Sequence, residues 1–303
     1  MPSPTPRFAL LGAAGYIAPR HLDAIRHVGG ELVAAHDPHD SVGVLDRYAP
    51  EAAFFTEYER FDRHLDKLRR AGRGVDYLAV CSPNHLHDAH CRLGLRLGAS
   101  VVCEKPATLN PWNLDALAEL EVESPGRVWC VLQSRLHPSF ARLRELGADG
   151  RAHRVRIAYV TPRGPWYRYS WKGDPERSGG VVANIGIHLF DALLTCFGRV
   201  VECATRELGV ERAAGTLTLA RPGGPPTEVE WLLSVRAADL PDAADGPHRR
   251  FEVDGEPIDF SSGFEELHRA SYERILAGEG FGLADARPAV ALVSELRGGE
   301  VDR

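Results

Sequence analysis

The chain has 303 residues, 44% of them hydrophobic, and a formal net charge of −6 at pH 7. This length favours two domains over one, and the negative charge argues against a nucleic-acid-binding surface, which needs a basic face. No run of about 18 consecutive apolar residues is present to span a membrane, and the N-terminus lacks the apolar stretch of a signal peptide. We therefore expect a cytoplasmic protein.

The first 133 residues alternate short apolar runs with amphipathic stretches. The apolar runs lie at 8–12, 31–36, 52–55, 75–81, 100–105 and 127–133, and the helical stretches at about 16–28, 39–48, 57–71, 85–97 and 110–123. Because hydrophobicity is nearly continuous within the runs, they indicate strands of a parallel sheet covered by helices on both faces. We predict an N-terminal α/β domain over residues 1–133, with a doubly wound parallel sheet of the Rossmann type.

Residues 134–303 have a different pattern of polar and apolar residues, which indicates a second, α+β domain. The string HRVRIAYV at 153–160 alternates polar and apolar residues, as a half-exposed antiparallel strand does. We predict a large, open, mostly antiparallel sheet with helices on one face and a symmetric partner subunit on the other. Further strands are expected at about 199–208, 211–220, 228–236, 249–254 and 257–260, and helices at about 137–147, 183–197, 264–277 and 284–297, with a loop at 161–180.

Six cysteines are spread singly along the chain, with no C-x-x-C pair. Several lie within apolar runs, which is typical of reduced thiols in a core, and no set of metal ligands is evident. We expect no metal. The cysteines are Cys81, Cys91, Cys103, Cys130, Cys196 and Cys203.

A glycine-rich turn follows the first predicted strand, with Gly12, Gly15 and Ala18 at a spacing close to G-x-G-x-x-G/A. In a dinucleotide-binding fold such a turn lets backbone N–H groups approach a pyrophosphate. Asp37 follows the second strand, 22 residues after Gly15, where a carboxylate binds the adenosine ribose hydroxyls and repels a 2′-phosphate. The pattern predicts NAD as cofactor; the alternative is a simple tight turn.

Polar residues follow two later strands of the same domain. Ser82, Pro83 and Asn84 come after the strand at 75–81, and Glu104 and Lys105 end the run at 100–105. Because ligands bind beyond the carboxyl ends of parallel strands, these loops are expected to flank a nicotinamide. The lysine is a candidate acid–base residue, since partial desolvation lowers its pKa; the alternative is a solvated ion pair.

A Gly-Gly pair at 179–180 precedes an apolar helix that carries a polar stripe. Asn184 and His188 are four residues apart and share one helix face, and Asp191 lies three residues further. A single histidine on such a helix is more often a core residue. The polar stripe directly after a flexible glycine pair favours a functional site.

These motifs together resemble the Gfo/Idh/MocA oxidoreductases. The strings that carry the resemblance are GAAGYIAPRH, CSPNHLH, CEKP, TPRGPWYRYSWKGDPERSGG and NIGIHLFD, and the likeness runs from Phe8 to Arg287. Within the family they are similar to the UDP-N-acetyl-2-amino-2-deoxy-D-glucuronate 3-dehydrogenase branch, the WlbA/WbpB type. Asn184 stands where many relatives outside this branch carry Asp.

The resemblance implies an NAD-binding domain at 1–133 and a substrate-binding and oligomerisation domain at 134–303, usually in a homotetramer. It implies NAD-dependent oxidation of the C3 hydroxyl of the UDP-linked uronic acid to a 3-keto sugar, during synthesis of bacterial surface polysaccharide such as O-antigen. The alternatives are a family dehydrogenase for another nucleotide sugar, a free sugar or inositol, and a non-catalytic NAD-binding protein.

The resemblance also implies site residues. Lys105 and His188 are the expected base and alkoxide-stabilising group, in either order, with Asn184 beside them. The expected cofactor-binding residues are Gly12, Ala14, Gly15, Tyr16, Ile17, Asp37, Ser82, Pro83, Asn84, His87, Glu104, Lys105 and Gln133. The expected substrate-binding residues are Lys105, Arg135, Arg163, Trp166, Tyr167, Arg168, Ser170, Trp171, Lys172, Asn184 and His188, because cations and aromatic rings suit a sugar carboxylate and a pyrophosphate.

Overall fold

A computed structural model describes residues 5–242, 246–260 and 263–298. Contacts between residues divide the chain into two compact units, the first drawn from residues 1–108, 112–131 and 266–286, and the second from 109–111, 132–265 and 287–303. The predicted domain boundary at residue 133 does not include the return of the chain to the first unit at residues 266–286. The return follows from the packing of helix α10 (Leu267–Leu276) against helix α1 (Ala18–His27), where Arg269 pairs with Asp23 at 2.7 Å.

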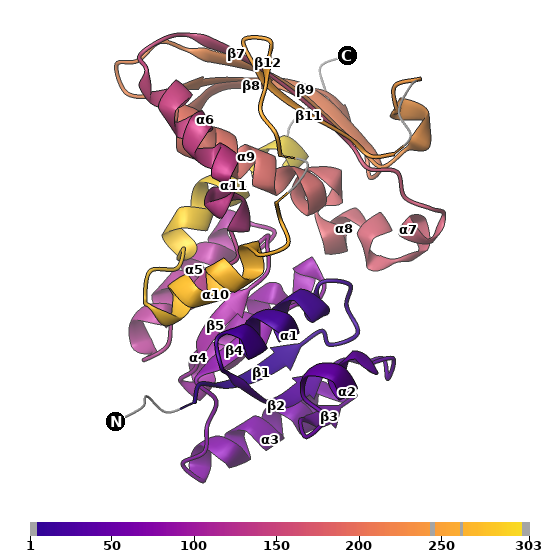
Figure 1. Cartoon of the computed structure of the whole chain (residues 1–303), viewed down its shortest axis with the longest axis vertical. Helices are drawn as coiled ribbons and strands as arrows, with labels where there is room; N and C mark the ends of the chain where they lie inside the picture. The colour runs from indigo at the N-terminus through magenta and orange to yellow at the C-terminus, as the bar shows by residue number, and fades with distance from the viewer. Residues whose placement is uncertain (1–4, 243–245, 261–262, 299–303) are drawn as a thin grey trace. The chain divides into compact units, whose positions relative to one another are not determined.

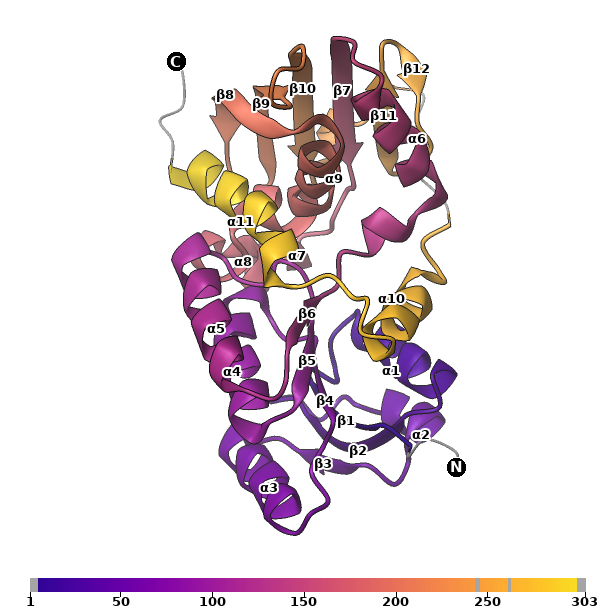
Figure 2. The ribbon, with the colours of Figure 1, turned by 90° about the vertical axis from the view of Figure 1, so that its left-hand side faces the viewer.

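The first unit contains a six-stranded sheet in the order β3-β2-β1-β4-β5-β6, in which every neighbouring pair is parallel (Figure 1 labels β1 to β5, and Figure 2 also β6). The strand order reverses between β1 and β4, which is where open α/β sheets bind ligands. The predicted doubly wound parallel sheet is confirmed. Its strands are β1 (Arg7–Leu11), β2 (Glu31–His36), β3 (Ala53–Phe55), β4 (Tyr77–Val80), β5 (Ser100–Cys103) and β6 (Val128–Cys130).

Helices of the first unit bury apolar faces against this sheet. In α1, Leu22 and Ile25 lie three residues apart, share one face and join a core that includes Phe8 of β1 and Tyr272 of α10. Besides α1 and α10, the helical elements are α2 (Val44–Tyr48), α3 (Tyr58–Arg70), η1 (Asn84–Leu86), α4 (His87–Leu97) and α5 (Pro111–Glu123), which belongs to this unit from residue 112.

The second unit contains a mixed sheet in the order β12-β11-β7-β10-β9-β8. The prediction of β7 as an antiparallel strand is half right, because β7 is antiparallel to β11 but parallel to β10. Parallel neighbours need a crossover, and the helices and hairpin between β7 and β10 supply it. The strands are β7 (His153–Val160), β8 (Arg199–Leu208), β9 (Arg212–Ala220), β10 (Thr227–Ser234), β11 (His248–Val253) and β12 (Glu256–Pro257).

One face of this sheet is covered by helices α6 (Pro138–Ala148) and α9 (Ile187–Phe197), as Figure 2 shows. Phe190 of α9 packs edge-on against Trp231 of β10, with 5.4 Å between ring centroids. The opposite face carries exposed charged side chains, among them Arg154 and Glu228 at 3.2 Å. The remaining helical elements are η2 (Gln133–Leu136), α7 (Trp166–Tyr169), η3 (Trp171–Gly173), α8 (Pro175–Ser178), η4 (Val182–Gly186), η5 (Ala237–Asp239) and α11 (Leu283–Gly298), which belongs to this unit from residue 287.

The helical run Pro175–Phe197 is long and apolar enough to cross a membrane by length and composition alone. Within its most apolar window, 72% of the residues are buried inside the protein, which is the environment of a core helix. All six cysteines are free thiols, five of them buried and Cys203 half-buried, in agreement with the prediction of reduced core thiols.

Candidate functional site

The turn between β1 and α1 is closed against the end of β4. Gly12 has a φ of +89°, and a Cβ at this position would lie 2.6 Å from the carbonyl carbon and oxygen of Cys81. A side chain is therefore excluded here. The N–H groups of Gly12 and Ala13 both donate to the His36 carbonyl, at 2.8 and 3.2 Å. The turn thus brings the ends of β1, β2 and β4 together.

The N-terminus of α1, next to this turn, has the features of an anion site. Its N-cap residue Ile17 provides no side-chain hydrogen bond, and Tyr16 beside it is 91% exposed. The Asp37 carboxylate accepts the N–H of Ala14 at 3.0 Å and that of His39 at 2.9 Å. A carboxylate has about four lone-pair sites, so Asp37 can accept two further donors. The positive end of the α1 dipole fits a pyrophosphate, with the Ala18 and Arg20 N–H groups bonded to backbone carbonyls, and Asp37 fits a ribose diol.

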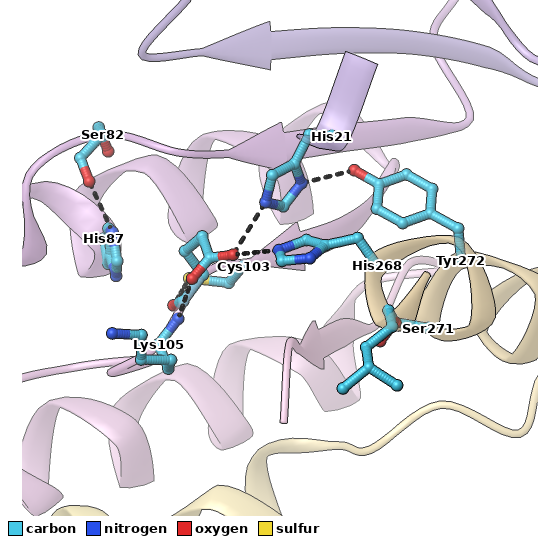
Figure 3. Close-up of polar contacts among 10 residues, drawn as sticks. His21, Ser82, His87, Cys103, Lys105, His268, Ser271 and Tyr272 are labelled. Atoms are coloured by element: carbon cyan, nitrogen blue, oxygen red, sulfur yellow. Dashed lines mark hydrogen bonds and ion pairs between the residues drawn. The ribbon is translucent and has the colours of Figure 1, made fainter. Parts of the chain in front are cut away.

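His87 joins the loop after β4 to the loop after β5. It is fully buried, with its Nε2 at 2.9 Å from the Ser82 carbonyl and its Nδ1 at 2.7 Å from the Pro106 carbonyl. Burial lowers the pKa of His87, although both carbonyl contacts oppose the shift. The imidazole therefore lies between the two predicted nicotinamide loops, and Figure 3 shows its contact with Ser82. Its own contact with a cofactor stays a prediction, as does that of the buried Asn84.

Glu104, directly after β5, lies in a buried network that no local sequence pattern predicts. Its Oε1 lies 2.9 Å from Nε2 of His21 in α1 and 3.1 Å from Nε2 of His268 in α10. Nδ1 of His21 lies 2.8 Å from the hydroxyl of Tyr272 (Figure 3). Oε2 accepts the backbone N–H of Lys105 at 3.2 Å. Both carboxylate oxygens are thus engaged within the chain, and the predicted cofactor contact of Glu104 stays a prediction.

The network determines the charge of Glu104. Burial alone would raise the pKa of this carboxyl, but hydrogen bonds from His21 and His268 outweigh it and hold the pKa well below its usual range. Ligand atoms of these three residues lie within 4.8 Å of one another, a spacing that metal sites also show. Because both imidazole Nε2 atoms are already bonded to one carboxylate oxygen, the three groups form a hydrogen-bond network.

In the second unit, the glycine pair and the helix after it depart from regular geometry. Gly179 and Gly180 have φ values of +78° and +70°, and a Cβ on Gly179 would lie 2.4 Å from that of Ala183. Residues 182–186 form a π-helical turn before α9, where a regular helix was expected. Such turns often mark functional sites. Asn184, within the turn, and His188, just after it, are both half-buried.

The aromatic segment at 166–171 meets this π-helical turn through Tyr167. The side-chain amide of Asn184 donates to the Tyr167 hydroxyl at 3.4 Å, and burial raises the pKa of that phenol. The Lys172 ammonium lies 5.8 Å from the Trp166 ring centroid and 5.0 Å from that of Trp171. These are cation–π distances. The structure therefore brings five of the predicted substrate-binding residues into direct contacts.

Two predicted substrate-binding arginines are paired with carboxylates of the chain. Arg135 makes two hydrogen bonds to Asp191, at 2.9 and 2.7 Å, and both side chains are more than nine-tenths buried. Arg168 makes two to Glu211, at 2.7 and 2.9 Å, but is 70% exposed. A substrate anion at either arginine would compete with an internal carboxylate. Arg163 is exposed.

Ser170 and Gln133 complete the predicted site residues. The Ser170 hydroxyl donates to the Tyr167 carbonyl at 2.9 Å and accepts the N–H of Lys172 at 3.3 Å, so it shapes the aromatic segment. The buried Oε1 of Gln133 has no hydrogen-bond partner among the described residues. Lys105 and His188 belong to different units, and their joint action stays a prediction.

The chain is similar to known oxidoreductases over most of its length. Residues 6–131 match the oxidoreductase family model with the NAD-binding Rossmann fold, which confirms the predicted cofactor class, and residues 140–255 match the GFO/IDH/MocA C-terminal domain. A solved structure of the WlbA (WbpB) dehydrogenase from Thermus thermophilus, in complex with NAD and alpha-ketoglutarate, is 46% identical with a TM-score of 0.94. The alignment covers 99% of this chain and 97% of that one. A second structure of the same dehydrogenase is in complex with NAD and UDP-GlcNAcA.

Curated relatives are more distant. The inositol 2-dehydrogenase of Rhizobium meliloti is 27% identical over 70% of this chain, and a putative UDP-kanosamine synthase oxidoreductase subunit of Amycolatopsis mediterranei is 28% identical over 55%. The matched regions span 61% and 47% of those two proteins. Two family models and a nearly full-length relative thus agree with the resemblance seen in the motifs, and the chain belongs to the Gfo/Idh/MocA family of oxidoreductases.

Proposed function

We propose that the protein is an NAD-dependent dehydrogenase that oxidises the C3 hydroxyl of UDP-N-acetyl-2-amino-2-deoxy-D-glucuronate to the 3-keto sugar. In the cell this reaction would serve the synthesis of diacetamido uronic acids in bacterial surface polysaccharide. The observation that carries the proposal is the end-to-end likeness to the Thermus thermophilus dehydrogenase in complex with NAD and UDP-GlcNAcA, 45% identical with a TM-score of 0.93.

The geometry around Gly12 supports NAD as the cofactor. A Cβ at Gly12 would clash with the backbone of Cys81, and the turn leads directly into the positive N-terminal end of α1. These groups would hold the pyrophosphate, and Asp37 would accept the ribose hydroxyls while repelling a 2′-phosphate. When bound, the nicotinamide accepts the hydride that leaves the sugar carbon.

The chain would supply the proton chemistry through Lys105 and His188. Oxidation of a secondary alcohol requires removal of the hydroxyl proton as hydride leaves the carbon. One of the two side chains takes that proton, and the other orients the hydroxyl and stabilises the developing negative charge on oxygen. Burial lowers the pKa of Lys105, which brings its neutral, proton-accepting form closer to physiological pH.

Substrate recognition would use the aromatic segment of the second unit. The Lys172 ammonium, 5.8 and 5.0 Å from the ring centroids of Trp166 and Trp171, offers a positive charge beside stacking surfaces. A uronate carboxylate and a UDP pyrophosphate both need such cations. The exposed Arg163 supports the same role.

The direct test is NADH formation measured by absorbance with a panel of UDP-hexuronates, free sugars and inositol. We expect turnover with the UDP-linked acetamido-glucuronic acid and little with free sugars. Activity on inositol or a free sugar alone would replace the proposed substrate, an outcome that the inositol dehydrogenase relative makes worth testing. Parallel assays with and without alpha-ketoglutarate would establish whether NADH is reoxidised on the enzyme.

Single substitutions test the two proposed acid–base residues. Lys105→Ala and His188→Ala should each lower kcat by about 10² to 10⁴-fold while NAD binding persists, because positioned proton transfer contributes that much. Lys67→Ala, at an exposed lysine of α3, is the matched control. Unchanged turnover in either site variant would refute that residue's role.

We also propose a cytoplasmic homotetramer. The face of the second sheet that carries Arg154, Arg156, Glu228 and Glu230 is the candidate subunit interface, since these charges alternate with the buried side chains of β7 and β10. Light scattering at several protein concentrations tests the assembly, and a stable monomer would contradict it.

A further inference from the structure

The buried cluster around Glu104 has no part in the proposed proton transfer, yet it adjoins the lysine that does. Glu104 Oε1 is shared by His21 and His268, at 2.9 and 3.1 Å, and Oε2 accepts the backbone N–H of Lys105 at 3.2 Å. With Tyr272, these residues all belong to the first unit. Figure 3 shows His21, His268 and Tyr272 on one side of the cluster and Lys105 on the other.

One assignment of protons suits this cluster. With a neutral His21, the Tyr272 hydroxyl donates to Nδ1 and the Nε2–H donates to Glu104. His268 also donates its Nε2–H to Glu104, and its buried Nδ1 has no partner among the described residues. A proton on that Nδ1 would be a buried unsatisfied donor, so a neutral imidazole is favoured. The carboxylate is then the single charge among these four side chains.

We propose that His21, His268 and Tyr272 are positioning residues that hold the Glu104 carboxylate in its charged form against Lys105 and thereby govern the charge state of the Lys105 side chain. The proposal rests on the proposed function in taking Lys105 as an acid–base residue. It assigns a functional role to α10, a helix that follows the second sheet in the sequence but packs in the first unit.

The surrounding titratable groups support this role for Glu104. Burial lowers the pKa of Lys105, and the negative charge of Glu104 opposes that shift. The thiols of Cys81 and Cys103 have pKa values raised well above the usual range by burial, and burial lowers the pKa of His87. The two thiols are therefore uncharged near neutral pH. Among the described residues of the first unit, the Glu104 carboxylate is the charge that counteracts desolvation of the lysine.

The lysine content allows a direct measurement, because the chain has only three lysines, Lys67, Lys105 and Lys172. NMR of protein labelled with ¹³C at the lysine side chains would give three signals to follow against pH. In Glu104→Gln, which keeps the shape and the carbonyl oxygen but removes the charge, the pKa of Lys105 should fall by about one unit or more. The exposed Lys67 serves as an internal reference, and the acid limb of kcat/KM should move the same way.

The imidazoles are tested by a pair of substitutions at His268. Leu removes the donor to Glu104, whereas Gln places an N–H close to the same position. The small inflection in the Lys105 signal that reports protonation of Glu104 should move to higher pH in His268→Leu and return in His268→Gln. His27→Gln is the control, because His27 and Glu273 form an exposed 2.7 Å pair between the same two helices, and it should leave the Lys105 titration unchanged.

An unchanged Lys105 titration in a folded Glu104→Gln protein would overturn the proposal. So would a stoichiometric bound metal whose removal by a chelator shifts that titration, since a cation would then be holding Glu104. If Glu104→Gln does not fold, the two His268 variants provide the test. The proposal is overturned if the inflection in the Lys105 signal lies at the same pH in His268→Leu and His268→Gln. The titration needs no substrate, so a Lys105→Ala protein with full turnover would refute the proposed acid–base role separately.

Discussion

Each unit buries a carboxylate, and the two carboxylates are compensated in different ways. Glu104 of the first unit accepts hydrogen bonds from two imidazoles, whereas Asp191 of the second makes a bidentate pair with Arg135. The two imidazoles donate to Glu104 as neutral groups, whereas a guanidinium stays charged. The first cluster therefore keeps the negative charge of its carboxylate, while the second is a neutralised, fixed structural pair.

The largest effect is expected from breaking the fixed pair. Arg135→Ala leaves Asp191 buried without its guanidinium, and we expect a loss of about 3 to 5 kcal/mol of stability in the second unit. Denaturant unfolding monitored by hydrogen exchange in α9 would measure this loss of stability. The double variant Arg135→Met with Asp191→Leu removes both charges and should recover most of the loss. A cost below about 1 kcal/mol for Arg135→Ala would show that the two clusters do not differ as described.

A smaller effect is expected from pH, which should change the stability of the two units in opposite directions. Burial lowers the pKa values of His21 and His87, and lowers that of His90 to about 3 from 6.5. Below pH 6.5 the unfolded chain therefore binds more protons than the folded one, so the first unit loses stability as the pH falls. Hydrogen exchange in α1 and α4, corrected for intrinsic rates, should show more frequent opening at about pH 5 than at about pH 7.

In the second unit, stability should depend on pH in the opposite direction. Burial would lower the pKa of His153, but its contacts with Asp254 and Asp149 outweigh burial and raise it. This contribution is complete below the unfolded pKa and is lost as the pH rises through the folded one. Opening of β7 around His153 should therefore increase on the alkaline side. Parallel pH responses in β7 and in α1 would contradict the contrast.

The smallest effect is expected at the exposed Arg168–Glu211 pair. Arg168 is 70% exposed, so solvent screens this interaction, and Arg168→Ala should leave the unfolding transition unchanged within error. If Arg168 also binds substrate, the variant raises KM without affecting stability. A clear loss of stability would mean that exposure does not distinguish this pair from the buried Arg135–Asp191 pair.

Local pattern was sufficient to predict much of the fold and part of the site. The predicted runs overlap all six strands of the first sheet, because near-continuous apolar stretches are a property of consecutive residues. The turn at Gly12 and the carboxylate at Asp37 were recognisable for the same reason, since each directly follows a strand. Glu104 and Lys105 were also singled out, as residues after a strand that flank a nicotinamide and, for Lys105, as a candidate acid–base residue.

The partners of those residues were decided by tertiary structure. His268 lies 164 positions from Glu104, and Tyr272 lies 251 from His21, so no periodicity connects them. The parallel pairing of β7 with β10 and the π-helical turn at 182–186 likewise depend on packing between distant segments. The sequence by itself determined which residues form strands, turns and helices, since those depend on near neighbours. Only the tertiary structure decided how the buried charges are compensated, because desolvation and hydrogen bonding act on whatever groups folding brings within about 3 Å of one another.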